Sequence, residues 1–328
     1  MRALVYTGRE TLEGREVPEP CPEAGEVLIR VAAAGICGSD MHAYLGHDAR
    51  RPAPLILGHE AAGVIEGGPR DGARVTINPL VTCGACPACR SGRENLCPER
   101  QIISMPPREG AFAEFVRMPE RNLVAVPDGV PLEVAALAEP LAVSWHAVRL
   151  GMAALPPGVA GRALVVGGGA IGLAAALALS AQGCTEVVVA ERNAARRGYL
   201  ARRCGVVVVA EAEAEGAWPL VIDAVGLAAT RAVASARAAP GGVIVHIGLG
   251  EDAGGLDIRR MTLQEITFIG TYTYTGQDFR DTCAAMVAGR LGPLDWAETR
   301  GLSEGAAAFA DIRAGRVAVP KIVLRPGG

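Results

Sequence analysis

The pattern of hydrophobic and polar positions divides the chain into two parts. Up to residue 141, short apolar runs alternate with turns rich in Gly, Pro and Asp, which is typical of β-strands. We expect strands at residues 27–33, 63–66, 74–77 and 113–117. The first part is therefore predicted to be β-rich.

From residue 142 onward, apolar strands alternate with Ala-rich helical stretches. The predicted strands cover residues 163–166, 186–190, 206–210, 220–224, 242–247 and 267–271. This alternation implies βαβ units and a doubly wound parallel sheet, so the fold class is α/β. A last apolar run, at residues 317–324, is predicted to be a strand that returns to the first part.

One uncharged stretch, residues 163–185, is about as long as a membrane-spanning helix. Consecutive glycines at positions 167–169 interrupt it, and another glycine follows at position 172. A buried strand, a glycine turn and a buried helix over residues 171–181 explain the stretch better than a membrane span does.

Composition limits the possible partners. The 328-residue chain has a net charge of -3 and is 50% hydrophobic, which gives no long-range attraction for nucleic acid or acidic membranes. Only a few apolar residues follow Met1 before Gly8, so no secretory signal is predicted. Nine cysteines without such a signal indicate a reducing compartment, for which we expect the cytoplasm.

A glycine motif of the form G-x-G-x-x-G follows the strand at residues 163–166 and opens a helix. It consists of Gly167, Gly168, Gly169, Ala170, Ile171 and Gly172. Such glycines permit a tight turn, close approach of a pyrophosphate and close helix–strand packing, and the helix N-terminus faces the phosphates. Alone, the motif would fit an ordinary αβ turn; after a strand and before a helix it predicts dinucleotide binding.

Glu191 ends the next strand, where an acid would accept hydrogen bonds from ribose hydroxyls. A carboxylate would repel a 2′-phosphate, so Glu191 favours NAD as the cofactor. Arg192, Arg196 and Arg197 lie close by in the sequence and could instead receive that phosphate. NADP therefore remains the alternative.

Four cysteines occupy one short polar segment with the spacing C-x2-C-x2-C-x7-C: Cys83, Cys86, Cys89 and Cys97. Zinc favours tetrahedral thiolate sites, and such gaps allow all four sulfurs to reach one ion. A site with four thiolates leaves no position for substrate, so we expect this zinc to be structural.

Three fragments together resemble one family. They are GICGSDMH at residues 35–42, GHE at residues 58–60, and the four-cysteine segment. With the glycine motif, the chain resembles the zinc-dependent medium-chain dehydrogenases/reductases of the alcohol and polyol dehydrogenase superfamily. The resemblance covers nearly the whole chain.

The resemblance implies a GroES-like catalytic domain with an inserted Rossmann domain and an active site in the cleft between them. We expect the catalytic domain at residues 1–141 with a structural-zinc lobe at 78–100, the Rossmann domain at 142–275, and a return to the catalytic domain at 276–328. It also implies a small-molecule alcohol or ketone substrate and a homodimer or homotetramer.

A catalytic zinc needs three or four protein ligands and one open position. Cys37 offers a thiolate and His59 an imidazole, with the carboxylates of Glu60 and Glu139 as further candidates. In the polyol branch of the family, the counterparts of Cys37, His59 and Glu60 bind zinc, and the counterpart of Glu139 binds zinc or its water. Which carboxylate binds zinc directly is left open.

Ser39 and His42 match the family's proton relay, in which the hydroxyl takes the alcohol proton and passes it through the cofactor ribose to the histidine. A hydroxyl beside the alkoxide and an imidazole near solvent make a plausible path for the proton. We therefore expect both residues to be catalytic.

Two departures from the family stand out. Only residues 206–219 remain between Gly205 and the strand at 220–224, where the family has a strand, a helix and more loop. Tyr272 and Tyr274 also differ from what a strict sorbitol or threonine dehydrogenase would carry. The short crossover would alter the adenine side of the cofactor site, and the tyrosines leave the substrate open.

We predict an NAD(P)-dependent zinc oxidoreductase of secondary alcohols, diols or polyols. One alternative is a zinc-independent NADPH enone or quinone reductase on the same fold, which would not need Cys37, His59 and Glu60 together. Another is a non-enzymatic zinc module that binds nucleic acid, which the acidic chain and the glycine motif oppose.

Overall fold

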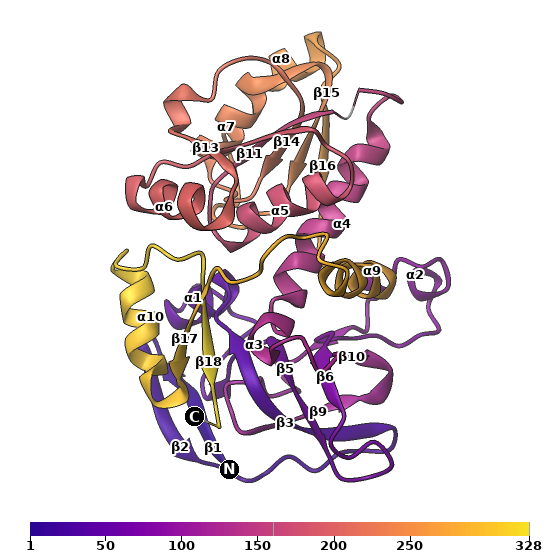
Figure 1. The fold of residues 1–328 in the computed structure, drawn as a ribbon, viewed down its shortest axis with the longest axis vertical. Coiled ribbons are helices and arrows are strands. Elements are labelled where there is room, and N and C mark those ends of the chain that lie inside the picture. Colours follow the sequence, from indigo (N-terminus) through magenta and orange to yellow (C-terminus); the bar gives the residue numbers. More distant parts are fainter. Residues whose placement is uncertain (160, 328) are drawn as a thin grey trace. The chain divides into compact units, whose positions relative to one another are not determined.

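The computed structural model describes residues 1–159 and 161–327 and contains two compact units. The β-rich unit comprises Met1–Glu139, Thr275–Val287 and Ala297–Gly328, and the parallel-sheet unit comprises Pro140–Tyr274 and Ala288–Trp296. Both chain termini lie in the β-rich unit (Figure 1). The domain boundaries expected from the sequence remain predictions.

One large sheet organises the β-rich unit, with the strand order β10-β6-β5-β3-β18-β17 and β9 paired to β3. Its strands are β3 (Glu26–Gly35), β5 (Glu60–Glu66), β6 (Arg74–Ile77), β9 (Phe115–Pro119), β10 (Leu123–Ala125), β17 (Ala297–Gly301) and β18 (Lys321–Arg325). The predicted return of the C-terminal segment is thus present: β18 pairs with β3 through Val323–Gly35 and Leu324–Ala34.

Two small sheets and several short helices complete this unit. The sheets are β2-β1-β4 and β7-β8, formed by β1 (Arg2–Gly8), β2 (Thr11–Glu16), β4 (Leu55–Ile56), β7 (Leu80–Val81) and β8 (Gln101–Ile102). The helices are α1 (Gly38–Tyr44), α2 (Pro87–Arg90), η1 (Glu94–Leu96), η2 (Glu120–Asn122), α3 (Leu132–Ala135), α9 (Gly276–Val287), η5 (Leu302–Glu304) and α10 (Gly305–Arg313).

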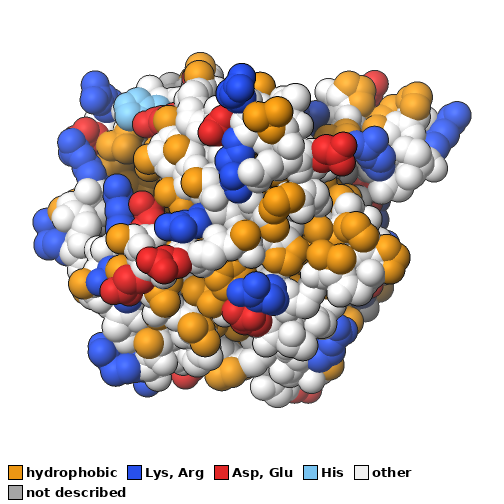
Figure 2. Space-filling model, turned by 90° about the horizontal axis from the view of Figure 1, so that it is seen from above, with side chains coloured by type: hydrophobic (Ala, Val, Ile, Leu, Met, Phe, Trp, Pro, Cys, Tyr) orange, Lys and Arg blue, Asp and Glu red, His pale blue; other side chains and the backbone are white. Residues whose placement is uncertain are grey.

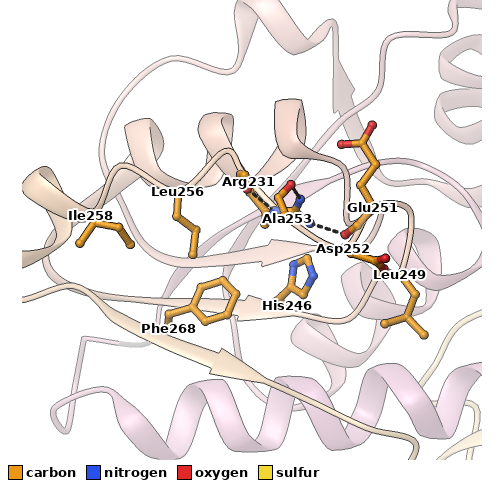
Figure 3. Close-up of a pocket in the computed structure, with 11 residues that line it drawn as sticks. Arg231, His246, Leu249, Glu251, Asp252, Ala253, Leu256, Ile258 and Phe268 are labelled. Carbon is orange, nitrogen blue, oxygen red and sulfur yellow. Dashed lines mark hydrogen bonds between the residues drawn. The ribbon is translucent and has the colours of Figure 1, made fainter.

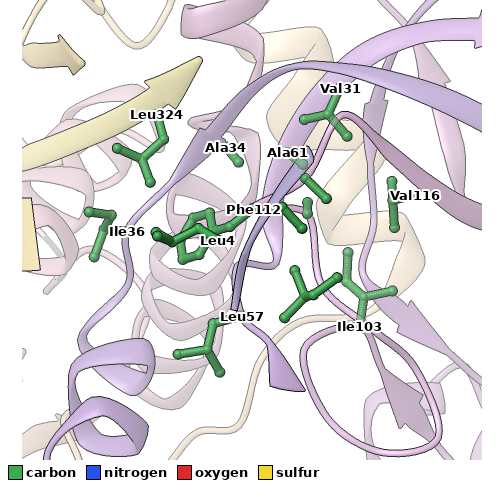
Figure 4. Close-up of a cluster of buried hydrophobic side chains, with 14 of the residues drawn as sticks. Leu4, Val31, Ala34, Ile36, Leu57, Ala61, Ile103, Phe112, Val116 and Leu324 are labelled. Carbon is green, nitrogen blue, oxygen red and sulfur yellow. The ribbon is translucent and has the colours of Figure 1, made fainter. Parts of the chain in front are cut away.

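The core of the β-rich unit is built from branched aliphatic residues and a few aromatic rings (Figure 4). Ile36, Leu57 and Ile103 are buried in it, and they stand one or two residues before Cys37, His59 and Ser104 respectively. Because these apolar side chains are anchored in a close-packed core, the polar residues beside them have fixed backbone positions.

The parallel-sheet unit confirms the predicted doubly wound sheet. Its six strands have the order β13-β12-β11-β14-β15-β16, and every neighbouring pair is parallel. They are β11 (Arg162–Val166), β12 (Glu186–Ala190), β13 (Val207–Val209), β14 (Trp218–Asp223), β15 (Ala238–His246) and β16 (Thr267–Gly270). The order reverses between β11 and β14, the switch point where such sheets bind ligands.

Among the described residues, five helical segments lie in the connections other than the one between β13 and β14. They are α5 (Ala170–Ala181), α6 (Ala194–Tyr199), η3 (Leu200–Cys204), α7 (Ala228–Arg237) and α8 (Ile258–Leu263). Between β13 and β14 there is only the single-turn helix η4 (Glu211–Glu213). The short crossover expected from the sequence is therefore present.

Several boundaries differ from the sequence prediction. The last strand begins at Lys321 rather than at residue 317. Strand β2 was not predicted because most of its residues are exposed and polar, and strand β1, whose middle residues are buried, was not predicted either. Helix α4 (Ala138–Ala154) begins early enough to place Glu139 in its first turn.

On the face seen in Figure 2, positive and negative side chains are interspersed rather than gathered by sign, in keeping with the small net charge of -3. Within residues 1–159 and 161–327, no helix combines the length and the apolar character needed to cross a bilayer.

Candidate functional site

The structure brings Cys37, His59 and Glu60 together. One ligand atom from each lies within 4.8 Å of the others. Cys37 follows β3 and precedes α1, and Glu60 is the first residue of β5. Because β3 and β5 are antiparallel, with Gly35 opposite Glu60, the sheet register itself places these side chains beside one another.

Asp40 and Ser104 orient the imidazole of His59. The Nδ1 atom of His59 lies 3.3 Å from Ser104 Oγ and 3.5 Å from Asp40 Oδ1. Because Nδ1 faces these two oxygens, Nε2 is the ring nitrogen left to bind a metal, as in carboxylate–histidine pairs of metal sites. Neither residue was predicted to be functional from the sequence, although Asp40 stands three residues after Cys37, a spacing typical of a helix cap.

Asp40 also fixes the backbone around the two ligands. Its Oδ2 accepts a 2.9 Å hydrogen bond from the Cys37 amide, and its Oδ1 accepts a 3.2 Å bond from the Gly58 amide. Burial opposes ionisation of Asp40, but His59, Arg51 and the Cys37 amide outweigh it and lower the pKa of the carboxyl group. Burial likewise opposes protonation of His59, yet Asp40 and Cys37 raise its pKa well above the usual value.

Glu60 is paired with a lysine from the other end of the chain. The Lys321 Nζ atom donates to Glu60 Oε1 at 2.7 Å and to the Ile36 carbonyl at 2.9 Å. Glu60 Oε2 is buried and has no hydrogen-bond partner. A sulfur, an imidazole nitrogen and a carboxylate oxygen within reach of one ion form a donor set that suits zinc, and a buried carboxylate oxygen without a hydrogen-bond partner is available to bind such an ion.

The other predicted residues of this region lie as follows. Glu139 is buried in the first turn of α4, but the group of close ligand atoms found among the described residues does not include it. Ser39 and His42 are half-buried and lie three residues apart on α1, so they are one turn apart on the same helix. Their roles remain predictions.

The four-cysteine segment forms the second group of possible ligands. The Sγ atoms of Cys83, Cys86, Cys89 and Cys97 all lie within 4.8 Å of one another. Cys83 is 3.9 Å from Cys89 and 3.5 Å from Cys97, and Cys86 is 3.5 Å from Cys89. Zn–S bonds of about 2.3 Å in a tetrahedron require sulfur separations of about 3.8 Å, so the spacing fits one zinc ion.

Backbone amides point at two of the four sulfurs. The amides of Ala85 and Cys86 point at Cys83 Sγ over 3.5 and 3.4 Å, and the Cys89 amide points at Cys86 Sγ over 3.5 Å. The lobe is also tied to a distant segment of the β-rich unit, because Glu94 Oε1 accepts a 2.6 Å bond from the Gly276 amide.

The glycine motif has the geometry expected of a dinucleotide loop. Gly167 has a φ of 98°, which favours glycine, and a Cβ on Gly172 would lie 1.8 Å from the Gly167 carbonyl oxygen. Gly169 is the N-cap of α5 and has open space around its missing Cβ. The loop therefore leaves the start of α5 accessible to a phosphate.

Glu191 closes this loop from the next strand. Its Oε2 accepts a 2.8 Å bond from the Gly168 amide and its Oε1 a 2.7 Å bond from the Asn193 amide. Arg196 Nη1 lies 4.0 Å from Glu191 Oε2, whereas Arg192 is exposed. The Glu191 carboxylate is therefore bonded directly to the glycine loop, and Arg196 lies beside that carboxylate.

A pocket of about 590 Å³ lies in the parallel-sheet unit under the loop that follows β15 (Figure 3). His246 and Phe268 form one wall, with ring centroids 5.5 Å apart. His246 Nδ1 lies 3.0 Å from the buried Asp223 Oδ2. Arg231 holds the loop through the carbonyls of Glu251, Ala253 and Gly254. None of the proposed zinc ligands lines this pocket.

Comparisons with known proteins agree with this arrangement. Residues 23–128 match the alcohol dehydrogenase GroES-like domain, and residues 170–288 match the zinc-binding dehydrogenase family. An L-galactonate-5-dehydrogenase of Escherichia coli K12 is 34% identical over 310 residues, which cover 89% of this chain and 88% of that protein.

Solved structures extend the similarity to the fold. An alcohol dehydrogenase of E. coli CFT073 complexed with NADH superimposes with a TM-score of 0.87 at 26% identity, covering 99% of both chains. A putative zinc-binding dehydrogenase of Sinorhizobium meliloti 1021 bound to NADP gives a TM-score of 0.88 at 27% identity, also over 99% of both chains.

Proposed function

This chain belongs to the zinc-dependent medium-chain dehydrogenase/reductase family, and from that premise we propose which of its residues perform the reaction. It is an oxidoreductase that uses zinc and a nicotinamide cofactor and acts on secondary alcohols or polyols. The proximity of Cys37, His59 and Glu60 carries the proposal, because three different zinc-binding groups converge on one point.

In our proposal, Cys37, His59 and Glu60 hold the catalytic zinc, and Glu139 supports it or its water. When bound, zinc supplies a Lewis acid that polarises the substrate oxygen, and the nicotinamide supplies the acceptor for hydride. Asp40 and Ser104 keep the His59 ring oriented, and the core residues beside the ligands keep their backbone fixed.

Ser39 and His42 move the alcohol proton in this proposal. Ser39 Oγ would accept the proton of the substrate hydroxyl and give up its own proton at the same time, and His42, one turn further along α1 and partly exposed, would release a proton to water. Helix α1 follows Cys37 directly, so one short segment supplies both a metal ligand and the proton path.

We further propose that NAD is the preferred cofactor. The glycine motif of residues 167–172 would hold the pyrophosphate, and Glu191 would accept hydrogen bonds from the ribose. Steady-state kinetics with both cofactors test this preference. A higher kcat/KM with NADP than with NAD would contradict it and would point to Arg192 or Arg196 as phosphate ligands.

The four-cysteine lobe is proposed to hold a structural zinc. We propose a homodimer or homotetramer located in the cytoplasm, where the thiolates of both zinc sites stay reduced. Sedimentation velocity of the zinc-loaded protein tests the assembly, and a monomer would contradict it.

Metal analysis and a substrate panel test the main proposal. Zinc-replete protein should contain about two zinc ions per chain, and Cys37→Ser should contain about one. A panel of secondary alcohols, diols and polyols should produce reduced-cofactor absorbance with the native protein only. Absence of turnover with both cofactors would contradict the proposed site, and enone reduction that survives Cys37→Ser would favour the zinc-independent reductase.

A further inference from the structure

Lys321 is the only lysine of the chain, among 32 lysine and arginine residues in total. The other 31 of these residues are arginines, and the Lys321 side chain is 3% exposed. A lysine ammonium is a compact point charge, whereas the arginine guanidinium is a wide planar fork. Lys321 therefore places a compact positive charge at this buried position.

The partners of Lys321 explain this buried charge. Its Nζ atom donates to the Ile36 carbonyl, next to Cys37, and to Glu60 Oε1. The residue thus links the backbone before one proposed zinc ligand to the side chain of another. A buried carboxylate needs such a partner, because an unpaired charge in a protein interior is strongly unfavourable.

The two oxygens of Glu60 consequently differ. Oε1 is occupied by the Lys321 ammonium, and Oε2 is buried without a partner. Gly35 provides the space for Oε2: a Cβ at position 35 would lie 2.1 Å from that oxygen. Gly35 stands opposite Glu60 in the β3–β5 pairing, so the strand register and the missing side chain together fix the carboxylate.

We propose that Lys321 is a positioning residue for the catalytic zinc: it holds Oε1 of Glu60 and so presents Oε2 alone to the metal. This inference rests on the proposed function, in which Glu60 is a zinc ligand. It implies that Glu60 coordinates through one oxygen, and that the site keeps its shape before metal binds because Lys321 already balances the buried carboxylate.

The unmodified protein allows a first test, since its single lysine gives a single side-chain NMR signal without assignment. In protein carrying isotope-labelled lysine, the Lys321 signal should shift when zinc is added to the metal-free native protein. The shift should be absent in Cys37→Ser, which keeps the four-cysteine lobe. If the Lys321 signal does not shift although the native protein binds two zinc ions, the inference is wrong.

Cobalt replacement of zinc tests the coordination itself. The Cys37→Ser spectrum, subtracted from that of each protein, removes the contribution of the four-cysteine lobe. In Lys321→Met both oxygens of Glu60 become available, so coordination through two oxygens should lower the visible d–d absorption per cobalt ion. An unchanged or stronger absorption in Lys321→Met would overturn the inference.

Two further variants guard against a general folding defect. Arg108→Met removes another poorly exposed cation, 2.8 Å from Glu26, and should leave the cobalt spectrum unchanged. The double variant Lys321→Met/Glu60→Gln should have a higher melting temperature in the metal-free state than Lys321→Met alone. The reason is that both partners of the buried pair are then neutral. Additive losses in the double variant would show that the two residues do not act as a pair.

The failures of the two proposals are distinguishable. If native protein and Cys37→Ser contain the same amount of zinc, the proposed catalytic site is wrong. If native protein contains the expected second zinc while Lys321→Met gives the native cobalt spectrum, the site stands and only the role of Lys321 is wrong.

Discussion

Asp40 supports the proposed zinc site through three contacts that a single carboxylate makes. It accepts bonds from the amides of Cys37 and Gly58 and lies 3.5 Å from His59 Nδ1. Such partners of metal-binding histidines fix the ring orientation and the protonated nitrogen. The sequence motif contains Asp40, but only the folded chain shows that it faces His59, which stands nineteen residues later.

We expect Asp40→Asn to weaken zinc binding at the catalytic site by about 10- to 100-fold, because the amide keeps the shape but not the charge. Competition with a chromophoric chelator measures the affinity, and the four-cysteine lobe of the same protein serves as the internal reference. If the proposed catalytic site of Asp40→Asn binds zinc as tightly as that of the native protein, Asp40 only caps the backbone.

Asp48 connects the same region to pH. Burial would raise its pKa, but hydrogen bonds and charges from Arg50 and Arg51 lower it to about 2. Arg51 in turn donates to the Ser104 carbonyl at 3.0 Å. A lowered pKa in the folded state stabilises the protein above the unfolded-state pKa of about 3.9, and this contribution disappears as the pH falls toward 2.

Asp48→Asn should therefore lower the free energy of unfolding at pH 7 by about 1 kcal/mol; the value is small because the Arg50 side chain is 58% exposed and solvent screens its pair with Asp48. The difference from native protein should narrow as the pH falls below about 4. Urea unfolding at several pH values measures it. If the difference in free energy of unfolding between the two proteins does not change with pH, the Asp48→Asn effect comes from packing and not from the charge of Asp48.

At the scale of elements, the turn between β11 and α5 shows how glycines at two positions can serve different purposes. A Cβ at Gly172 would lie 1.8 Å from the Gly167 carbonyl oxygen, whereas a Cβ at Gly169 would meet nothing within 4 Å. Gly172 is thus required for packing α5 against the preceding turn, and Gly169 for the approach of a ligand.

We expect Gly172→Ala to lower the free energy of unfolding by about 1–3 kcal/mol, the usual cost of overpacking. Gly169→Ala should keep the native stability and raise the Kd for cofactor at least about tenfold, which is about 1.4 kcal/mol. Thermal unfolding and cofactor titration of both variants separate the two effects. Native cofactor affinity in Gly169→Ala would contradict a pyrophosphate at this turn.

At the scale of the whole molecule, the sequence predicted what short segments encode. The glycine motif, the four cysteines and the parallel strands are local patterns, and each was found where expected. The pairing of Lys321 with Glu60 was not predicted, because it joins residues 261 positions apart and depends on β18 lying beside β3. The first turn of α4 around Glu139 was missed because that apolar stretch carries no clear cap.

Both proposed zinc sites lie within the β-rich unit, so metal removal should affect the two units unequally. We expect chelation to increase amide hydrogen exchange in residues 83–97 most strongly, because this polar lobe has little apolar core of its own. The start of α9 should follow, since the Gly276 amide is bonded to Glu94 of the lobe. Strands β11 to β16 should exchange as before.

A matched pair of variants assigns the effect to the correct metal. Cys89→Ser should reproduce the increased exchange of the lobe in zinc-replete protein, and Cys37→Ser should not. If zinc removal increases exchange in the parallel sheet as much as in the lobe, zinc stabilises the whole chain. If the lobe stays protected in Cys89→Ser, the lobe folds without metal. Increased exchange of the lobe in Cys89→Ser but not in Cys37→Ser would show that the zinc of the lobe is structural and that the zinc at Cys37 is not needed for folding of the lobe.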